Sequence, residues 1–200
     1  MSIIVEHEKR RYEILEKALD VFMEEGFEDA TFQKIADKCN ITRTTLYIYF
    51  KNKREIFNFS IKQLLESMEH DIIKIKMEKN LSHREKLIKV MIMIIENLKD
   101  NRSLLSVILS YLLYTSRDNF DPNDRVRRRT VRMRRILTSM LIEGVRAKEF
   151  HQNLNVKEAN ELLYTSLEAA VFRLVVLRRA SVEELKTAMQ LAINNFTQAT

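Results

Sequence analysis

Residues 31–54 read TFQKIADKCNITRTTLYIYFKNKR, and this segment predicts two short helices separated by a tight turn and followed by a longer helix. Thr31 and Thr42 each precede a short run of helix formers, where a threonine hydroxyl can accept a hydrogen bond from the first turn of the helix. Asn40 lies between the two runs, and asparagine tolerates the positive φ at which a helix ends. Asn52 can cap a third helix that begins at Lys53.

The chain before this segment predicts one amphipathic helix over about residues 7–25. Its apolar residues recur at helical spacing: Ile14, Leu15, Ala18, Leu19, Phe22 and Met23. Gly26 follows, and glycine readily adopts the left-handed conformation that ends a helix. Residues 1–53 are therefore expected to form a three-helix domain.

The whole chain is expected to be all-α. Its 200 residues include 2 Gly and 1 Pro, which are too few for the turns of a multi-stranded sheet. The remaining helices are predicted over about residues 53–80, 82–99, 102–116, 122–149, 156–178 and 181–197. About nine helices result, and residues 54–200 are expected to form a second, larger helical domain.

The predicted helix over residues 43–49 is short and polar on its outer side. Leu46 and Phe50 lie one turn apart and can anchor its inner side. In a major groove, arginine pairs with guanine and apolar groups contact the methyl of thymine. Four residues are therefore candidates for reading bases: Arg43, Thr44, Tyr47 and Ile48. A solvated helix surface is the alternative for any one of them.

Four further residues are candidates for contacts with DNA phosphates: Thr31, Thr45, Tyr49 and Lys53. Three carry hydroxyl groups and one carries an ammonium group, and the amide groups at helix starts add further donors. Residues 31–54 hold six basic side chains and one acidic side chain, which suits an anionic partner. Phosphate contacts set register and affinity rather than sequence preference.

The N-terminal pattern resembles that of the TetR family of helix-turn-helix transcriptional regulators over roughly residues 10–58. The matching positions are Ile14 to Leu19, Phe22, Gly26-Phe27, Thr31, Ile35-Ala36, Asn40-Ile41-Thr42, Leu46-Tyr47, Tyr49-Phe50 and Lys51-Asn52-Lys53. The resemblance adds Gln33 as a base reader. Asn40 and Ile48 depart from the pattern, since many relatives have glycine before the turn and a polar or aromatic residue between the two tyrosines.

The last two predicted helices are expected to form a homodimer interface. The helix over residues 156–178 is apolar over too wide a surface for packing on one side only. In proteins that the chain resembles, the last two helices form a four-helix bundle between subunits. The predicted interface residues are Leu163, Leu167, Ala170, Val171, Leu174, Leu185, Met189, Ile193 and Phe196.

By the same resemblance, a small-molecule effector of unknown identity is expected among the helices of the second domain. The candidate contacts are polar or aromatic residues in otherwise apolar helices: Tyr111, Tyr114, Tyr164, Glu168 and Phe172. For any one of them, a satisfied core or interface residue is the simpler interpretation. Five methionines could line an adaptable cavity, although ordinary core packing is the simpler interpretation: Met68, Met91, Met93, Met133 and Met140.

The basic residues are concentrated in one further run, because residues 125–135 contain seven arginines and no acid. On a helical wheel most of them face solvent, opposite the apolar side. An anionic effector, an acidic patch on a second subunit or an auxiliary DNA contact are the alternatives. The role of this run stays open.

The sequence predicts neither an enzyme nor a cofactor or metal protein. Cys39 is the single cysteine, the four histidines have no paired ligand spacing, and no glycine-rich phosphate loop is present. Ser, His and carboxylates form no recognisable catalytic constellation. The N-terminus has no apolar signal region and no stretch is long enough to span a membrane, so a cytoplasmic protein is expected.

The predicted function is that of a sequence-specific transcriptional regulator, a repressor that a small molecule releases from a palindromic DNA operator. By resemblance, the effector favours a subunit geometry in which two recognition helices no longer reach successive major grooves. The alternative is a structural or co-regulatory DNA-binding protein of the same fold that responds to no ligand. Titration of DNA binding with candidate compounds distinguishes the two.

Overall fold

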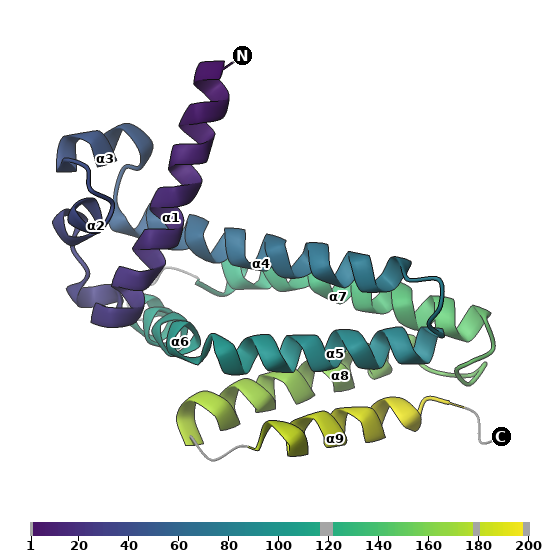
Figure 1. Ribbon diagram of the computed structural model, residues 1–200. Helices are drawn as coiled ribbons and strands as arrows, with labels where there is room; N and C mark the ends of the chain where they lie inside the picture. The colour runs from purple at the N-terminus through teal and green to yellow at the C-terminus, as the bar shows by residue number, and fades with distance from the viewer. Residues whose placement is uncertain (1, 117–121, 178–180, 198–200) are drawn as a thin grey trace. The chain divides into compact units, whose positions relative to one another are not determined.

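The computed structural model describes residues 2–116, 122–177 and 181–197, with side chains described for 5–113, 131–177 and 181–197. Its helices are α1 (Ser2–Asp29), α2 (Phe32–Lys38), α3 (Arg43–Tyr49), α4 (Lys53–Met77), α5 (His83–Asp100), α6 (Arg102–Ser116), α7 (Pro122–Arg146), α8 (Val156–Phe172) and α9 (Val182–Asn194) (Figure 1). A short π-helical segment, η1 (Arg173–Leu177), continues α8. The described part of the chain has no β-strand, so the all-α prediction is confirmed.

Local signals explain where the first helices end. Gly26 has φ 82° and ψ 170° and interrupts α1, which resumes for one turn up to Asp29. Asn40 has φ 54° directly after α2, as its tolerance of positive φ predicts. Both predicted breaks are therefore confirmed, although α1 begins earlier than the predicted helix.

The chain divides into two compact units. The first comprises residues 1–66 and 106–120, and the second comprises 67–105 and 121–200. The predicted domains, 1–53 and 54–200, place all of α6 and all of α4 except Lys53 in the second domain. In the structure, α4 and α6 each contribute residues to both units.

The first unit is built around aromatic side chains. Phe22, Phe50 and Phe57 are at most 1% exposed. The ring of Phe57 lies 4.9 Å from that of Phe22 and 4.8 Å from that of Tyr111, measured between ring centroids. This core holds α1 to α3 together with the first part of α4 and the second part of α6.

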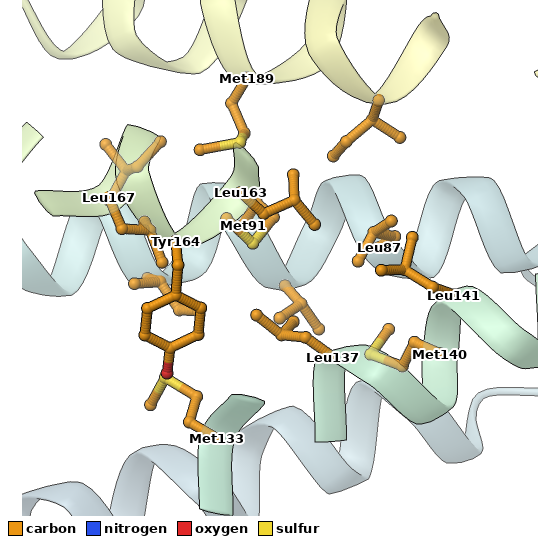
Figure 2. Close-up of a cluster of buried hydrophobic side chains, with 14 of the residues drawn as sticks. Leu87, Met91, Met133, Leu137, Met140, Leu141, Leu163, Tyr164, Leu167 and Met189 are labelled. Carbon is orange, nitrogen blue, oxygen red and sulfur yellow. The ribbon is translucent and has the colours of Figure 1, made fainter. Parts of the chain in front are cut away.

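The second unit has an aliphatic core rich in methionine. Helix α5 packs against α7, α8 and α9, and Figure 2 shows Met91, Met133, Met140 and Met189 among the leucines of these helices. Tyr164 lies in the same cluster with its hydroxyl end toward Met133. None of the described helices has both the length and the apolar character that crossing a bilayer requires.

Candidate nucleic-acid interface

The turn between α2 and α3 is fixed by two threonine caps. The Thr31 hydroxyl accepts a hydrogen bond from the amide of Lys34 at 3.2 Å, and the Thr42 hydroxyl accepts one from the amide of Thr45 at 3.1 Å. Both predicted caps are confirmed. Because each helix has only seven residues, a lost cap would remove a large share of its hydrogen bonding.

Helix α3 has a buried inner side and an exposed outer side. Leu46 and Phe50 are 0% and 1% exposed, whereas Tyr47 and Ile48 are 50% and 69% exposed. Arg43 and Thr44 are also exposed. The four predicted base readers therefore all lie outside the core on one short helix, as a recognition helix requires.

Arg43 and Tyr47 are held together on this outer side. Nη2 of Arg43 donates a hydrogen bond to the Tyr47 hydroxyl at 3.2 Å, and the guanidinium carbon lies 5.7 Å from the centre of the tyrosine ring. The same ring packs against Phe32 at the start of α2, with 4.6 Å between centroids. Tyr47 thus links the two helices and limits the positions that Arg43 can adopt.

Gln33 and the hydroxyl-bearing phosphate candidates are on the surface or at its edge, and each has a partner within the chain. Nε2 of Gln33 donates to Asp37 at 2.7 Å. The Thr45 hydroxyl shares a hydrogen bond of 2.8 Å with Thr42, and the ring of Tyr49 stacks on His7 at 4.6 Å. A hydroxyl that has one such partner can still make a second hydrogen bond, so these residues stay candidates.

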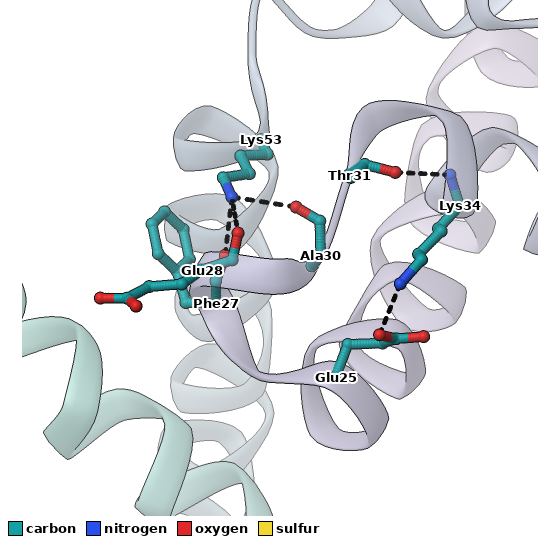
Figure 3. A network of polar contacts seen from close by, with 7 residues as sticks. All are labelled: Glu25, Phe27, Glu28, Ala30, Thr31, Lys34 and Lys53. Atoms are coloured by element: carbon teal, nitrogen blue, oxygen red, sulfur yellow. Dashed lines mark hydrogen bonds and ion pairs between the residues drawn. The ribbon is translucent and has the colours of Figure 1, made fainter.

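Lys53 occupies a different environment from the other phosphate candidates. Its ammonium group donates to the carbonyl oxygens of Phe27, Glu28 and Ala30 at 2.9, 2.6 and 2.9 Å (Figure 3). The nitrogen also lies 5.0 Å from the centre of the Phe27 ring. Partial burial lowers the pKa of Lys53, although Asp29 and Glu28 act in the opposite direction.

Side chains of α1 and α4 make further contacts within the first unit that no sequence pattern indicates. The guanidinium carbon of Arg11 lies 4.4 Å from the ring centre of Phe59 and 5.2 Å from that of Phe50. The buried Ser60 hydroxyl donates to the carbonyl of Leu15 at 2.9 Å. Neither contact has a local sequence signal, because the partners are distant along the chain.

The effector candidates with described side chains have different local environments. Tyr111 is buried in the first unit against Phe27, at 4.5 Å between ring centroids, whereas Tyr164 is buried in the second unit. Glu168 and Phe172 are exposed, and Tyr114 lies outside the described side chains. Burial raises the pKa of Tyr164 to about 12, although the nearby Arg134 opposes this shift.

Eight of the nine predicted interface residues are buried within the chain itself; only Val171 is partly exposed. The eight are Leu163, Leu167, Ala170, Leu174, Leu185, Met189, Ile193 and Phe196, each at most 7% exposed. A side chain that is already covered offers little surface to a second copy. These residues form the most apolar stripe of each helix, and in the structure they belong to the same buried cluster as residues of α5 and α7.

Two of the three arginines of the basic run that have described side chains make ion-pair or aromatic contacts within the second unit. Nε of Arg132 lies 2.9 Å from the buried carboxylate of Glu69. Arg134 pairs with Glu161 and lies 4.0 Å from the ring centre of Tyr164. Arg125, Arg128 and Arg129 lie outside the described side chains, and among the described residues no group of three or more His, Cys, Asp or Glu could hold a metal ion.

Comparison with known proteins supports the helix-turn-helix interpretation. Residues 14–58 match the family described as bacterial regulatory proteins, tetR family. The fatty acid metabolism regulator protein of Bacillus subtilis is 26% identical over 163 residues, which is 80% of each chain. The similar proteins are transcriptional regulators, in agreement with the prediction that the chain is not an enzyme.

Solved structures share the fold over nearly the whole chain. A TetR transcription regulator from Haloarcula marismortui aligns with a TM-score of 0.83 at 19% identity, covering 96% of this chain and 100% of the other. The regulator FadR from Bacillus subtilis, solved in complex with stearoyl-CoA, aligns with a TM-score of 0.68 at 23% identity, covering 90% and 96%. The helix-turn-helix formed by α2 and α3 lies within residues 14–58, the part of the chain that matches the tetR family of bacterial regulatory proteins.

Proposed function

We propose that the protein is a homodimeric repressor that binds a near-palindromic operator and leaves it when a long-chain fatty acyl-CoA binds. The observation that carries the DNA-binding part is the outer side of α3, where Arg43, Thr44, Tyr47 and Ile48 are all exposed. A short helix that exposes a tyrosine and an isoleucine gains little from folding alone. These side chains are matched to the acceptors and methyl groups of a major groove.

A second copy of the chain is the proposed partner of α8 and α9. Along α8 and η1, exposed residues recur at spacings of three and four and so share one face: Leu162, Thr165, Ala169, Phe172 and Val176. Leu191 on α9 is 62% exposed. Apolar side chains gathered in this way favour an interface, and a symmetric dimer presents the two recognition helices that a palindrome requires.

The acyl-CoA part rests on the similarity to a fatty acid metabolism regulator and on the chemistry of the second unit. The core of this unit is aliphatic and contains Met91, Met133, Met140 and Met189. Thioether side chains adapt to irregular apolar shapes, so such a core can rearrange around an acyl chain at low cost. The bound acyl chain would then favour a dimer geometry that does not span both half-sites.

Fluorescence anisotropy tests the effector. The protein is first bound to a duplex that it has enriched from random DNA, and stearoyl-CoA is then added, with acetyl-CoA, free CoA and stearate as controls. We expect release by stearoyl-CoA and not by acetyl-CoA or CoA. By linkage, the duplex should weaken stearoyl-CoA binding by the same factor. Release by none of these compounds favours the DNA-binding protein that responds to no ligand.

A further inference from the structure

The end of α1 leaves several backbone carbonyls without helical partners. A helix that ends leaves its last carbonyls to be satisfied by other groups. Gly26 interrupts α1, and the chain then passes through Phe27, Glu28 and Ala30 to Thr31, the cap of α2. The carbonyls of these three residues before Thr31 converge on one point, the ammonium group of Lys53 (Figure 3).

The number of donors equals the number of acceptors. A lysine ammonium has three protons, and the three carbonyls accept at 2.9, 2.6 and 2.9 Å. A DNA phosphate could bind this ammonium only by displacing one of the carbonyls. The Phe27 ring lies against the same nitrogen and is itself packed on Tyr111 and Phe57, so the carbonyl cage is supported from the core.

Lys53 also joins the two ends of the helix-turn-helix. Ala30 directly precedes the cap of α2, and Lys53 begins α4 three residues after Phe50, the last cap of α3. Residues 31–50 therefore lie within a loop that this one side chain closes. We propose that Lys53 is a positioning residue that fixes the recognition segment, and that it is not a phosphate anchor.

This proposal rests on the proposed DNA binding, and two substitutions separate the two roles. Arginine binds phosphate at least as well as lysine does, because its fork can pair with two oxygens. Its planar guanidinium does not fit three carbonyls that converge on a single ammonium. Lys53→Arg therefore preserves a contact with phosphate but disrupts the clamp, meaning the hold of Lys53 on the carbonyls of Phe27, Glu28 and Ala30. Lys53→Met removes both. Lys51→Met is the matched control, because Lys51 is exposed in the same segment.

The experiment measures the association constant for the enriched duplex over a range of salt concentrations and, separately, the thermal midpoint. If Lys53 is a clamp, Lys53→Arg and Lys53→Met should both lower the affinity for DNA by about tenfold at every salt concentration. This is the effect expected when the recognition segment is displaced and one contact with a base is lost. The slope of log K against log salt should match that of the wild type for Lys53→Arg. Both variants should unfold at a lower temperature, whereas Lys51→Met should not.

The opposite results would overturn the proposal. If Lys53 is a phosphate anchor, Lys53→Arg should keep full affinity and an unchanged thermal midpoint. The slope of log K against log salt should then be about 0.9 smaller per subunit for Lys53→Met than for the wild type.

If both Lys53 variants fail to fold, the NMR resonance of the Lys53 ammonium group in the wild type distinguishes a clamp from a phosphate anchor. It should be visible through slow proton exchange in the free protein and should not shift on adding duplex. If the wild type enriches no duplex, the proposed DNA binding fails, and the thermal and resonance measurements still test the clamp.

Discussion

The Tyr47 hydroxyl accepts a hydrogen bond of 3.2 Å from Arg43, one turn away on the exposed side of α3. The tyrosine ring is fixed on its other side by Phe32. A guanidinium restrained in this way loses less conformational entropy when it pairs with a base than a free arginine would. Because Tyr47 restrains Arg43 in this way, we expect base recognition to depend most on Arg43.

Arg43→Ala should therefore relax the base preference at one position of each half-site. The expected loss is about 1 to 3 kcal/mol per half-site if the arginine pairs with guanine through two hydrogen bonds. Arg43→Lys keeps the charge but not the fork, so it should lose the same preference while keeping the salt dependence of binding. Competition between the preferred duplex and single-base variants measures both effects.

Tyr47→Phe tests whether the hydrogen bond from Arg43 to the Tyr47 hydroxyl restrains the arginine. It removes only the hydroxyl, so we expect weaker discrimination at the position that Arg43 reads and little change in the thermal midpoint. Equal losses of affinity for all duplexes in Arg43→Ala would contradict a base-reading role and would assign the residue to the phosphates.

The dimer proposal predicts that a charge on the exposed face of α8 separates the subunits. Leu162 is 48% exposed, so Leu162→Glu should be tolerated by the isolated chain and should disrupt the interface. Loss of the paired half-site should lower operator affinity by about 100-fold or more. Met77→Glu on α4 is the control, since Met77 is 74% exposed and lies on a different helix of the same unit. Sedimentation equilibrium measures the association, and a monomeric wild type would refute the dimer.

The two glycines should respond to alanine for different reasons. A methyl group at Gly144 would overlap the buried ring of Phe150, whereas one at Gly26 would meet no neighbour but would sit at φ 82°. Gly144→Ala should cost about 1 to 3 kcal/mol of unfolding free energy through overpacking, and Gly26→Ala about 1 to 2 kcal/mol through backbone strain. Urea unfolding measures both. Phe150→Leu should partly rescue Gly144→Ala and should not rescue Gly26→Ala.

Because Tyr164 is buried, the protein should lose stability at high pH. Burial raises the pKa of Tyr164 to about 12, from an ordinary value of 10.0. Between these values the unfolded chain releases the phenol proton and the folded chain retains it, so the free energy of unfolding falls as pH rises. Each unit of separation is worth about 1.4 kcal/mol. Tyr164→Phe should lose less stability than wild type between pH 10 and 12; identical losses would contradict the assignment.

Local signals in the sequence predict the helix-turn-helix well. Thr31 and Thr42 cap α2 and α3, and Asn40 ends α2, because caps and positive φ are properties of single residues and their immediate neighbours. The exposed side of α3 could also be predicted, because Leu46 and Phe50 mark its inner side. Their contact with DNA remains a prediction.

Contacts between distant residues could not be predicted in this way. No local pattern indicates that Lys53 reaches the carbonyls of Phe27, Glu28 and Ala30, because the residues are more than 20 positions apart. Similarly, an apolar stripe on α8 predicts that the stripe is buried, but it does not identify whether α5 or a second subunit covers it. Tyr111 and Tyr164 share the same chemistry, but Tyr111 of α6 belongs to the first unit and Tyr164 to the second.

Selection of bound sequences from random duplex DNA, at defined salt and with the purified full chain, tests the central claim most directly. Two recognition helices related by a two-fold axis predict an enriched near-palindrome whose half-site centres are about 34 Å apart or a multiple of that distance. Arg43→Ala should enrich the same spacing with one position relaxed. Recovery of no sequence above non-specific binding would contradict the account of α3 as a base-reading helix.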